Sequence, residues 1–417
     1  MTEPWTELVG AAHVRAGGMP DAVDGIVPAW VVHPASVAEV QACVRTAARA
    51  GAALVASGGG AHLDIGAPPT RLDVLLRLDR LARILDHQAA DMTVTVEAGC
   101  PLAVLADRLA GAGQWLPLDP PRPEATTVGG LVAANLSGPL RASQGTVRDL
   151  LLGIRVVGAD GAVVASGGKV VKNVAGYDLP KLHVGALGTV GVIVEATFKV
   201  RPRPEREAAV VIACATPATA AALAGEVLDG PVPPLWLEIA GALGDRPALV
   251  VGLGGIEEEV AYGAAVVGAL AAQHCCEAQP VADGAALREC LAGFPVAPAA
   301  AVLRAATLRA RVGQMMDAVT SAARGAGATV RMLVHAANGV VRVAVDEPGS
   351  VAALVHALRP VLAAGGGSLV VERAVPEVKA TVDVWGDPGP GLTLMRRLKT
   401  SFDPASLFAP GRFVGGL

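Results

Sequence analysis

The stretch PEATTVGGLVAANLSG (123–138) decides the fold of this chain, together with GKVVKNVAGYDLPKL (168–182) and GALGTVGVIVEATFKVRP (185–202) that follow it. All three segments combine glycines and small side chains with short β-forming runs. Glycine lets the backbone approach a neighbouring molecule closely and adopt positive φ angles. The three segments therefore predict a chain that lies flat against a large ligand.

Upstream of this stretch the sequence alternates between helix and strand signals. A helix is expected over 36–51, and the strand 53–57 then opens directly into Gly58, Gly59 and Gly60. Consecutive amides without a Cβ can converge on an anion, which indicates a phosphate-binding turn. The cluster lacks the G-x-G-x-x-G spacing of a Rossmann fingerprint and the lysine of a P-loop, so a plain loop is the alternative.

More strands are expected on both sides of 123–138. Residues 92–99 alternate apolar and polar side chains, 189–200 form another β-rich run, and 150–166 have the pattern of a hairpin that turns at Asp160-Gly161. A helix is expected to start at Pro101. The proline-rich segment 201–206 is expected to end this domain.

The second half of the chain contains a repeated pattern. Residues 207–375 can be divided into two successive β-α-β-β-α-β units. Two such units predict ferredoxin-like halves that share one antiparallel sheet with helices on one face.

Composition excludes several classes of protein. The 417 residues suit two or three domains, and no run of about 18 apolar residues predicts a transmembrane helix. The first residues lack the pattern of a secretory signal, which makes the cytoplasm the expected location. The net charge of −4 without a basic cluster argues against nucleic acid as a partner.

The six cysteines form no CxxC motif and no closely spaced set of metal ligands. We therefore expect no metal in this chain, and any iron–sulfur centre would belong to another chain. Buried free thiols are the expected state of the cysteines.

Several ordered motifs together resemble a known family. SGGGAHL (57–63), LPLDPPRPEATTVGGLVAANLSG (116–138), KNVAGYDLPKL (172–182) and GALGTVGVIVEATFKVRPRP (185–204) resemble the vanillyl-alcohol oxidase, or PCMH, type of FAD-binding domain. In particular, the resemblance is to the FAD-binding subunit of bacterial glycolate oxidase (glycolate dehydrogenase). It covers roughly residues 28–206 and the tail LKTSFDPASLFAPGRF (398–413).

The resemblance implies an α+β protein. Residues 1–206 would form a PCMH-type FAD-binding domain of two α/β subdomains, and 207–390 a cap domain made of the two ferredoxin-like halves with an antiparallel sheet. Residues 391–417 would return to the FAD domain, where the arginines of the FAPGRF segment would fix the tail.

The resemblance also implies an FAD site built from three segments. The first segment holds the pyrophosphate, the second lies under the phosphates and ribityl chain, and the third meets the flavin or the adenine through its main chain. The implied residues are Ser57, Gly58, Gly59, Gly60, Ala61 and His62; Thr126, Thr127, Gly129, Gly130, Asn135, Ser137 and Gly138; and Gly188, Val192 and Ile193.

His62 decides between two modes of flavin attachment. Some members of the superfamily link the flavin covalently to a histidine that directly follows the glycines. In this chain Ala61 holds that place and His62 comes one residue later. Noncovalent FAD is therefore expected, with a covalent link as the alternative.

Oxidation of a 2-hydroxy acid by a flavin needs a cation for the carboxylate and a base or Lewis acid at the hydroxyl group. The related catalytic subunit carries two histidines in its cap domain that help to bind a metal. The corresponding segment VHAANGVVRV (334–343) has His335, with Arg342 near the place of the second histidine. His335 is thus either a structural imidazole or a catalytic candidate.

Other catalytic candidates lie in KNVAGYDL (172–179). Tyr177 and Lys172 are either substrate-binding residues or structural ones, with Asp178 capping the next turn and pairing with Lys172. Glu372 and Arg373 are a further candidate for carboxylate binding or an ion pair.

The predicted function is that of an FAD-binding subunit in a glycolate oxidase-like complex. It would take part in converting glycolate to glyoxylate and in electron transfer, beside a second FAD-containing hydroxy-acid oxidase subunit and an iron–sulfur subunit. Such a complex would be cytoplasmic or held at the inner membrane through its partners. The alternatives are a stand-alone FAD-dependent D-2-hydroxy acid (D-lactate-like) dehydrogenase and a structural subunit without flavin.

Overall fold

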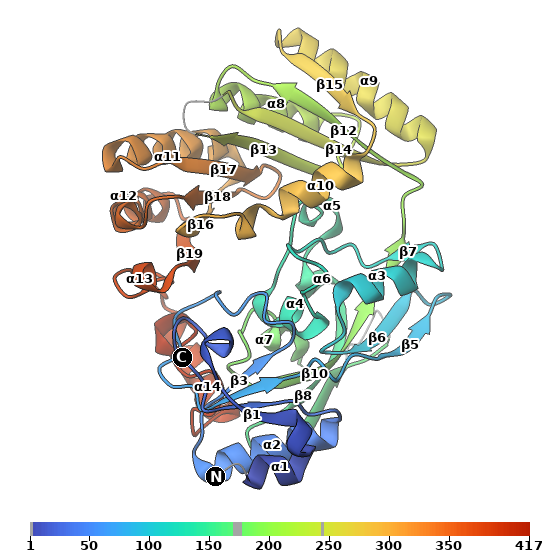
Figure 1. Cartoon of the computed structure of the whole chain (residues 1–417). Helices are drawn as coiled ribbons and strands as arrows, with labels where there is room; N and C mark the ends of the chain where they lie inside the picture. The colour runs from blue at the N-terminus through green and yellow to red at the C-terminus, as the bar shows by residue number, and fades with distance from the viewer. Residues whose placement is uncertain (1–2, 170–176, 243–245) are drawn as a thin grey trace. The chain divides into compact units, whose positions relative to one another are not determined.

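The computed structural model describes residues 3–169, 177–242 and 246–417. The chain divides into two compact units, and both are discontinuous in sequence (Figure 1). Unit 1 comprises Met1–Leu136, Thr146–Arg203 and Asp387–Leu417, and unit 2 comprises Ser137–Gly145 and Pro204–Gly386. The boundaries at 206 and 390 stay predictions from the sequence. The structure groups the short segment Ser137–Gly145 with the ferredoxin-like part of the chain.

The first sheet of unit 1 carries the glycine turn at the end of one strand. Its strands are β1 (Val14–Ala16), β2 (Trp30–Val32), β4 (Val74–Arg77) and β3 (Leu54–Ser57), in that order across the sheet. β2 and β3 both run parallel to β4, and α2 (Val37–Ala50) is the crossover between them. The Ser36 hydroxyl accepts a hydrogen bond from the Glu39 amide at 3.2 Å and so fixes the start of this helix.

The second sheet of unit 1 is antiparallel. Its strands are β5 (Ile84–Gln88), β6 (Thr93–Glu97), β10 (Val192–Lys199), β8 (Leu151–Val157) and β9 (Val163–Gly167), in that order across the sheet. β8 and β9 form the hairpin expected at Asp160-Gly161, where Gly161 has a φ of 74°. The two sheets give the two α/β subdomains that the resemblance implies.

Short elements complete unit 1. They are α1 (Glu3–Val9), α3 (Leu102–Ala110), β7 (Gln114–Trp115), α4 (Val128–Ala134), α6 (Val147–Leu150), α7 (Pro180–His183), β11 (Arg201–Pro202) and α14 (Leu392–Phe402). The proline-rich segment after α3 begins as a strand, because β7 pairs with β11.

The C-terminal tail completes the sheet that carries the glycine turn. The Leu54 amide donates to the Leu407 carbonyl at 2.8 Å, and the Ala409 amide donates to the Leu54 carbonyl at 2.9 Å. The side chains of Leu407 and Phe408 belong to the hydrophobic core of unit 1. The tail therefore lies beside β3 as an integral part of this unit.

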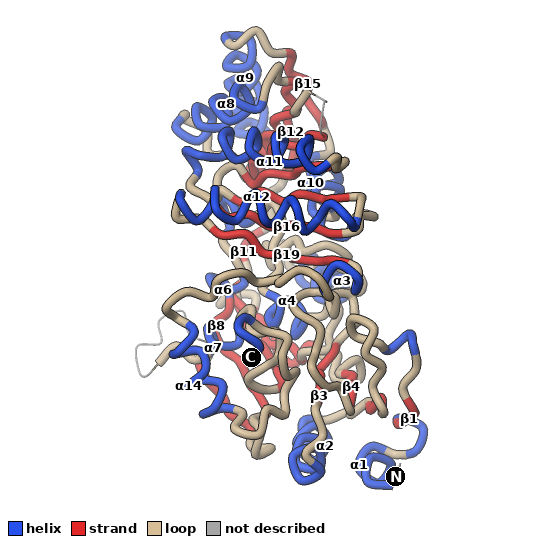
Figure 2. The backbone as a smooth tube through the Cα atoms, turned by 90° about the vertical axis from the view of Figure 1, so that its left-hand side faces the viewer, coloured by secondary structure: helices blue, strands red, loops and turns tan. Residues whose placement is uncertain are grey.

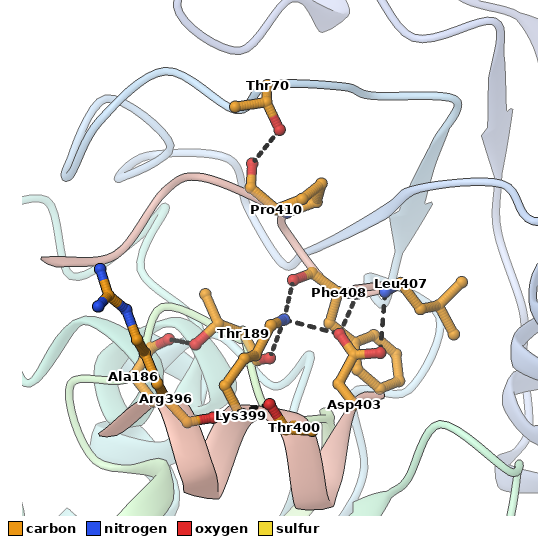
Figure 3. A network of polar contacts seen from close by, with 10 residues as sticks. All are labelled: Thr70, Ala186, Thr189, Arg396, Lys399, Thr400, Asp403, Leu407, Phe408 and Pro410. Atoms are coloured by element: carbon orange, nitrogen blue, oxygen red, sulfur yellow. Dashed lines mark hydrogen bonds and ion pairs between the residues drawn. The ribbon is translucent and has the colours of Figure 1, made fainter. Parts of the chain in front are cut away.

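Lys399 of α14 anchors the tail from below (Figure 3). Its ammonium group donates to the Thr189 carbonyl at 2.7 Å, to the Phe408 carbonyl at 2.9 Å and to Asp403 at 2.6 Å. Asp403 in turn accepts from the amides of Leu407 and Phe408, both at 2.8 Å. Lys399 and Asp403 are both buried, so this ion pair is an interior one.

Unit 2 is built on one eight-stranded antiparallel sheet. Its strands are β15 (Glu277–Val281), β12 (Arg206–Ala213), β14 (Ala248–Gly255), β13 (Trp236–Ala242), β17 (Val330–His335), β18 (Val340–Val345), β16 (Ala301–Ala306) and β19 (Ser368–Ala374), in that order across the sheet. The first half has the strand order 4-1-3-2 and the second half 2-3-1-4. They join through the pairing of β13 with β17. The topology confirms two ferredoxin-like halves that share one sheet.

Four long helices pack on one face of this sheet, and Figure 2 shows two of them, α11 and α12, in front of the strands. The four are α8 (Pro217–Asp229), α9 (Glu257–Gln273), α11 (Val312–Ala326) and α12 (Val351–Ala364). The shorter helices of the unit are α5 (Arg141–Gln144), α10 (Gly284–Ala292) and α13 (Pro376–Lys379). The side chains that face the four long helices are apolar, as for Leu237, Val334 and Val343.

The six cysteines differ in burial, and Cys276 is half-buried. Cys43, Cys100 and Cys214 are buried, and burial raises the pKa of Cys43 to about 12 and that of the other two to about 11. Cys275 and Cys290 are exposed, which corrects the expectation of buried thiols for these two. Cys275 lies in the turn after α9 with a φ of 53°, where its side chain leaves the core.

Candidate functional site

The glycine turn after β3 packs tightly on a second loop of unit 1. A Cβ on Gly58 would lie 2.0 Å from the Thr127 hydroxyl oxygen, and a Cβ on Gly59 would lie 1.9 Å from the Ala125 carbonyl oxygen. Gly60 has a φ of +80°, which side chains rarely adopt. These glycines are therefore needed for the packing of the two loops, in addition to any approach of a ligand.

The turn offers hydrogen-bond donors that the protein itself does not use. The amides of Gly58, Gly59, Gly60 and Ala61 have no acceptor among the described residues. The hydroxyl of Ser57 is buried, and within the described chain it also has no partner. A buried hydroxyl is normally satisfied, so Ser57 together with the unused amides beside it fits a bound anion such as a pyrophosphate.

The second loop also borders the site, and three of its amides are already engaged. The Val128 amide donates to the Cys100 carbonyl at 2.9 Å, and the Gly129 amide donates to the Ala98 carbonyl at 2.7 Å. The Gly130 amide donates to the Thr127 hydroxyl at 3.3 Å and so caps α4. The continuous row of unused amides thus comes from the first loop, while the amides of Val128, Gly129 and Gly130 are held by the protein itself.

His62 lies between the two loops. Its Nε2 is 2.6 Å from the Thr126 hydroxyl, which itself donates to the Pro121 carbonyl at 2.9 Å. Because the threonine proton is used for Pro121, His62 is the donor through Nε2. This bond holds the imidazole in place next to the glycine turn.

These groups line one cavity within unit 1. Its lining consists of residues 56–63, Ala125, Thr127, Gly130, Ala133, Ala134, Leu187 and Arg412. Arg412 is buried and donates through Nη2 to the carbonyls of Leu63 and Ile65, both at 2.6 Å. Burial lowers the pKa of Arg412, and the charges of Asp24 and Asp64 oppose this effect. The tail thereby places a permanent cation beside the unused donors.

Arg77 is a second cation that the sequence interpretation missed. It ends β4, and its Nη1 lies 3.3 Å from the position that a Cβ of Gly60 would occupy. Its only signal in the sequence is its place at the end of a buried parallel strand, level with Ser57 across the β3–β4 pair.

The other implied FAD residues are spread over three places. Asn135 ends α4 with a φ of 50°, while Ser137 and Gly138 belong to the segment grouped with unit 2. Val192 and Ile193 are core residues of β10 and pair with Val157 and Val156. Gly188 has a φ of +73° and open space at its Cβ position. Roles for these residues in flavin binding stay predictions.

The catalytic candidates in 172–179 lie partly outside the described residues, as Lys172 does. Tyr177 is described, and its side chain is 92% exposed. Asp178 forms an ion pair with Lys181 at 3.8 Å. Tyr177 and Lys172 therefore stay predictions for catalysis.

His335 is part of a buried polar cluster in unit 2. Its Nδ1 is 2.6 Å from Glu238, and its Nε2 is 2.5 Å from Nη1 of Arg342. Nε2 must accept from the arginine, so the proton of the neutral ring is on Nδ1 and is donated to Glu238. Burial, followed by the charges of Arg342, Arg141 and Arg304, lowers the pKa of His335 well below its usual value.

Arg342 also binds Glu372, through Nε at 2.8 Å and Nη2 at 3.3 Å. Burial acts to raise the pKa of Glu372, but the charge and hydrogen bonds of Arg342, together with the charges of Arg304 and Arg373, lower it to about 2. Both ring nitrogens of His335 are engaged, and Arg342 connects the ring to a carboxylate. The imidazole thus orients a cation.

This arrangement does not fit a metal ion. The guanidinium of Arg342 lies between the two groups, His335 Nε2 and the Glu372 carboxylate, that would otherwise serve as ligands. No group of three histidine, cysteine or acidic side chains suited to a metal occurs in the part of the chain that the structure describes.

The fold and the site define an FAD-binding domain of the PCMH type, joined in one chain to a pair of ferredoxin-like halves. Comparison with known proteins agrees, because residues 28–167 match the family described as FAD binding domain. The chain carries this domain, which confirms the resemblance for this part of the chain and the expected cofactor.

Its relatives include subunits of glycolate oxidases and dehydrogenases of 2-hydroxy acids. Glycolate oxidase subunit GlcE of Escherichia coli is 41% identical over 36% of this chain, and D-2-hydroxyglutarate dehydrogenase of Xanthomonas citri is 36% identical over 42%. These two alignments span 43% and 38% of the relatives' own lengths. Glycolate oxidase subunit GlcD of Bacillus subtilis is 26% identical over 93% of this chain and 89% of its own length.

Solved structures share the fold over the whole chain. An alkyldihydroxyacetonephosphate synthase matches 99% of this chain and 85% of its own, with a TM-score of 0.74 and 16% identity. At this identity the likeness concerns the fold alone.

Proposed function

We propose that this chain binds FAD noncovalently in the cavity of unit 1 and takes part in the oxidation of a small 2-hydroxy acid, glycolate to glyoxylate. The observation that carries the proposal is the row of unused donors formed by Ser57 and the amides of Gly58–Ala61. Arg412 adds a buried cation at the same cavity. A dianionic pyrophosphate would satisfy these donors at once.

Bound FAD supplies an acceptor for two electrons from the C–H bond next to the carboxylate. The chain itself contributes binding and orientation. Ser57 and the turn amides hold the pyrophosphate, and the second loop supports the cofactor from beneath. In unit 2, Arg342 is held in one orientation by His335 and Glu372, and such a fixed guanidinium suits a carboxylate.

We further propose that the chain acts as a subunit of a glycolate oxidase-like assembly. The partners would be a second FAD-containing hydroxy-acid oxidase subunit and an iron–sulfur subunit that accepts electrons. Two relatives that are named as glycolate oxidase subunits support this assignment. Within the described residues no helix has the length and apolar character needed to cross a bilayer. The proposed location is the cytoplasm, or the inner membrane through the partners.

A second candidate function is that of a stand-alone D-2-hydroxy acid dehydrogenase. The alignment with D-2-hydroxyglutarate dehydrogenase favours it. The two candidates differ in what the chain does alone, because only the second requires substrate oxidation without a partner.

The test is an anaerobic absorption spectrum of the purified, FAD-loaded chain. Glycolate, D-lactate and D-2-hydroxyglutarate are added in turn, with acetate as a control that lacks the hydroxyl group. Bleaching by a hydroxy acid in the isolated chain supports the stand-alone enzyme. Bleaching only after addition of a GlcD-type subunit supports the assembly. A chain that binds no FAD refutes both, and acid precipitation separates covalent from noncovalent flavin.

A further inference from the structure

The polar face of the unit 2 sheet, opposite the four long helices, brings several arginines together. Arg304 of β16 lies directly opposite Arg342 of β18 in the antiparallel register. Like charges in directly opposed positions destabilise a sheet. Arg304 also has no hydrogen bond or ion pair to any described residue. Two guanidiniums therefore share this face although only one of them has a carboxylate partner.

A third guanidinium comes from the segment Ser137–Gly145. Arg141 donates through Nη1 to the Ser137 hydroxyl at 3.2 Å, and its Nε has no partner among the described residues. Burial, followed by the charges of Arg342 and Arg304, lowers the pKa of Arg141 to about 10. α5 is fixed on this sheet, because the Ser143 hydroxyl donates to the Leu235 carbonyl at 2.7 Å. The position of Arg141 near the other two is thus set by packing.

The charges on this face do not balance. Among the described residues of this cluster, Arg141, Arg304, Arg342 and the buried Arg373 stand against the two carboxylates of Glu238 and Glu372. His335 is neutral, because its ring accepts from Arg342. A buried or half-buried surplus of positive charge is costly unless an anion offsets it.

We propose that Arg141, Arg304 and Arg342 form a binding site for a small carboxylate anion that works without a metal ion. The guanidinium of Arg342 supplies the positive charge that a metal ion would otherwise supply. His335 accepts from its Nη1, and Glu372 accepts from its Nε and Nη2, whereas a metal would need both groups as ligands. Arg304 and Arg141 provide the remaining donors. The choice of ligand rests on the proposed function, whereas the existence of the site does not.

The test measures oxalate binding to the full, FAD-loaded chain by isothermal titration calorimetry, after treatment with EDTA and removal of the chelator. Oxalate is chosen because it is a small carboxylate that the flavin cannot oxidise in this assay. We expect one site per chain, with an affinity that added Mn²⁺ or Zn²⁺ does not increase. Binding that occurs only after metal is restored, or no binding at all, overturns the proposal.

Arg304→Met should weaken oxalate binding at least tenfold, because a charge-assisted hydrogen bond is lost. It should also raise the unfolding temperature of the anion-free chain, since it removes a repulsion. The matched control is Arg331→Met on strand β17 of the same sheet, where the side chain pairs with Asp346 at 3.1 Å at the surface. An equal loss of binding in both variants, or a lowered unfolding temperature in Arg304→Met, contradicts the site.

A second variant, Arg304→Lys, distinguishes a loss of binding at the site from a loss caused by misfolding. It keeps the positive charge but loses the planar guanidinium, and we expect intermediate affinity. The outcome also separates this proposal from the proposed function. Oxalate binding without bleaching by any hydroxy acid, both in the chain alone and after addition of a GlcD-type subunit, would leave the site intact and contradict the oxidation. Bleaching without oxalate binding would do the reverse.

Discussion

Ser57→Ala tests the FAD site most directly, because the structure predicts opposite effects on stability and on cofactor binding. The hydroxyl of Ser57 is 5% exposed and has no partner within the described residues. Removing an unsatisfied buried hydroxyl is neutral or stabilising, so the apoprotein should unfold at the same temperature or higher. With FAD bound, the same hydroxyl is expected to donate to a phosphate oxygen. Losing a hydrogen bond to a charged group costs about 1.5–3 kcal/mol, which corresponds to roughly 10- to 150-fold weaker binding.

The assay is titration of the apoprotein with FAD, combined with thermal unfolding of the apoprotein. Ser350→Ala is the matched control, because the Ser350 hydroxyl donates to the Ala326 carbonyl at 3.1 Å in unit 2. The control should lose about 0.5–1.5 kcal/mol of stability and keep its FAD affinity. Unchanged FAD affinity in Ser57→Ala, or a destabilised apoprotein, would refute the assignment of this hydroxyl to the cofactor.

Three further variants test other parts of unit 1. Gly59→Ala should reduce FAD occupancy in the purified chain because its Cβ would force the two loops apart, whereas Gly268→Ala, with open space at the Cβ position, should keep full occupancy. Lys399→Met leaves its carboxylate partner buried and unpaired and should cost about 3–5 kcal/mol in denaturant unfolding; Lys169→Met, at an exposed ion pair, should cost less than about 1 kcal/mol, and equal losses would contradict the anchor. Burial lowers the pKa of His183 to about 4 from 6.5, so the unfolded chain takes up this proton first as the pH falls. Stability should drop by up to about 3 kcal/mol between pH 6.5 and 4 relative to His183→Phe, and parallel pH profiles would count against this.

Much of the fold could be predicted because local patterns and global architecture agree. The hairpin at Asp160-Gly161 and the two β-α-β-β-α-β units follow from turn residues and apolar periodicity. The burial of polar side chains was harder to predict from the sequence. Glu97 occupies a polar position in an alternating strand, yet it is only 2% exposed and binds Arg83 at 2.7 Å. Alternation indicates which residues share a face, but it does not show whether other elements cover that face.

The glycine turn was predicted as a phosphate site from its sequence, but the reason for the glycines was incomplete. Gly58 and Gly59 are also required by the close packing of the second loop. The sequence also could not show which loop has unused amides and which loop has amides that bind other parts of the protein. Whether an amide such as that of Gly129 is free depends on a carbonyl some thirty residues earlier, at Ala98.

The sequence contained a pattern from which the arginine cluster of unit 2 could have been predicted. Glu238, Arg304 and Arg342 are each a single charge within an otherwise apolar strand. A lone charge in such a strand needs a partner from a neighbouring strand. The strand order 2-3-1-4, read from the repeat, would have placed Arg304 and Arg342 on adjacent strands. The contribution of Arg141 could not be foreseen, because the segment that carries it lies in the first half of the chain.

The discontinuity of both units affects the order in which the protein can fold during synthesis. Strand β3 is synthesised early, but its neighbour at Leu407–Ala409 emerges from the ribosome about 350 residues later. The Lys399–Asp403 pair and Arg412 arrive at the same late stage. The ferredoxin-like sheet can therefore assemble while the first sheet still lacks its final segment, and the cavity for the cofactor is complete only when translation has passed Arg412.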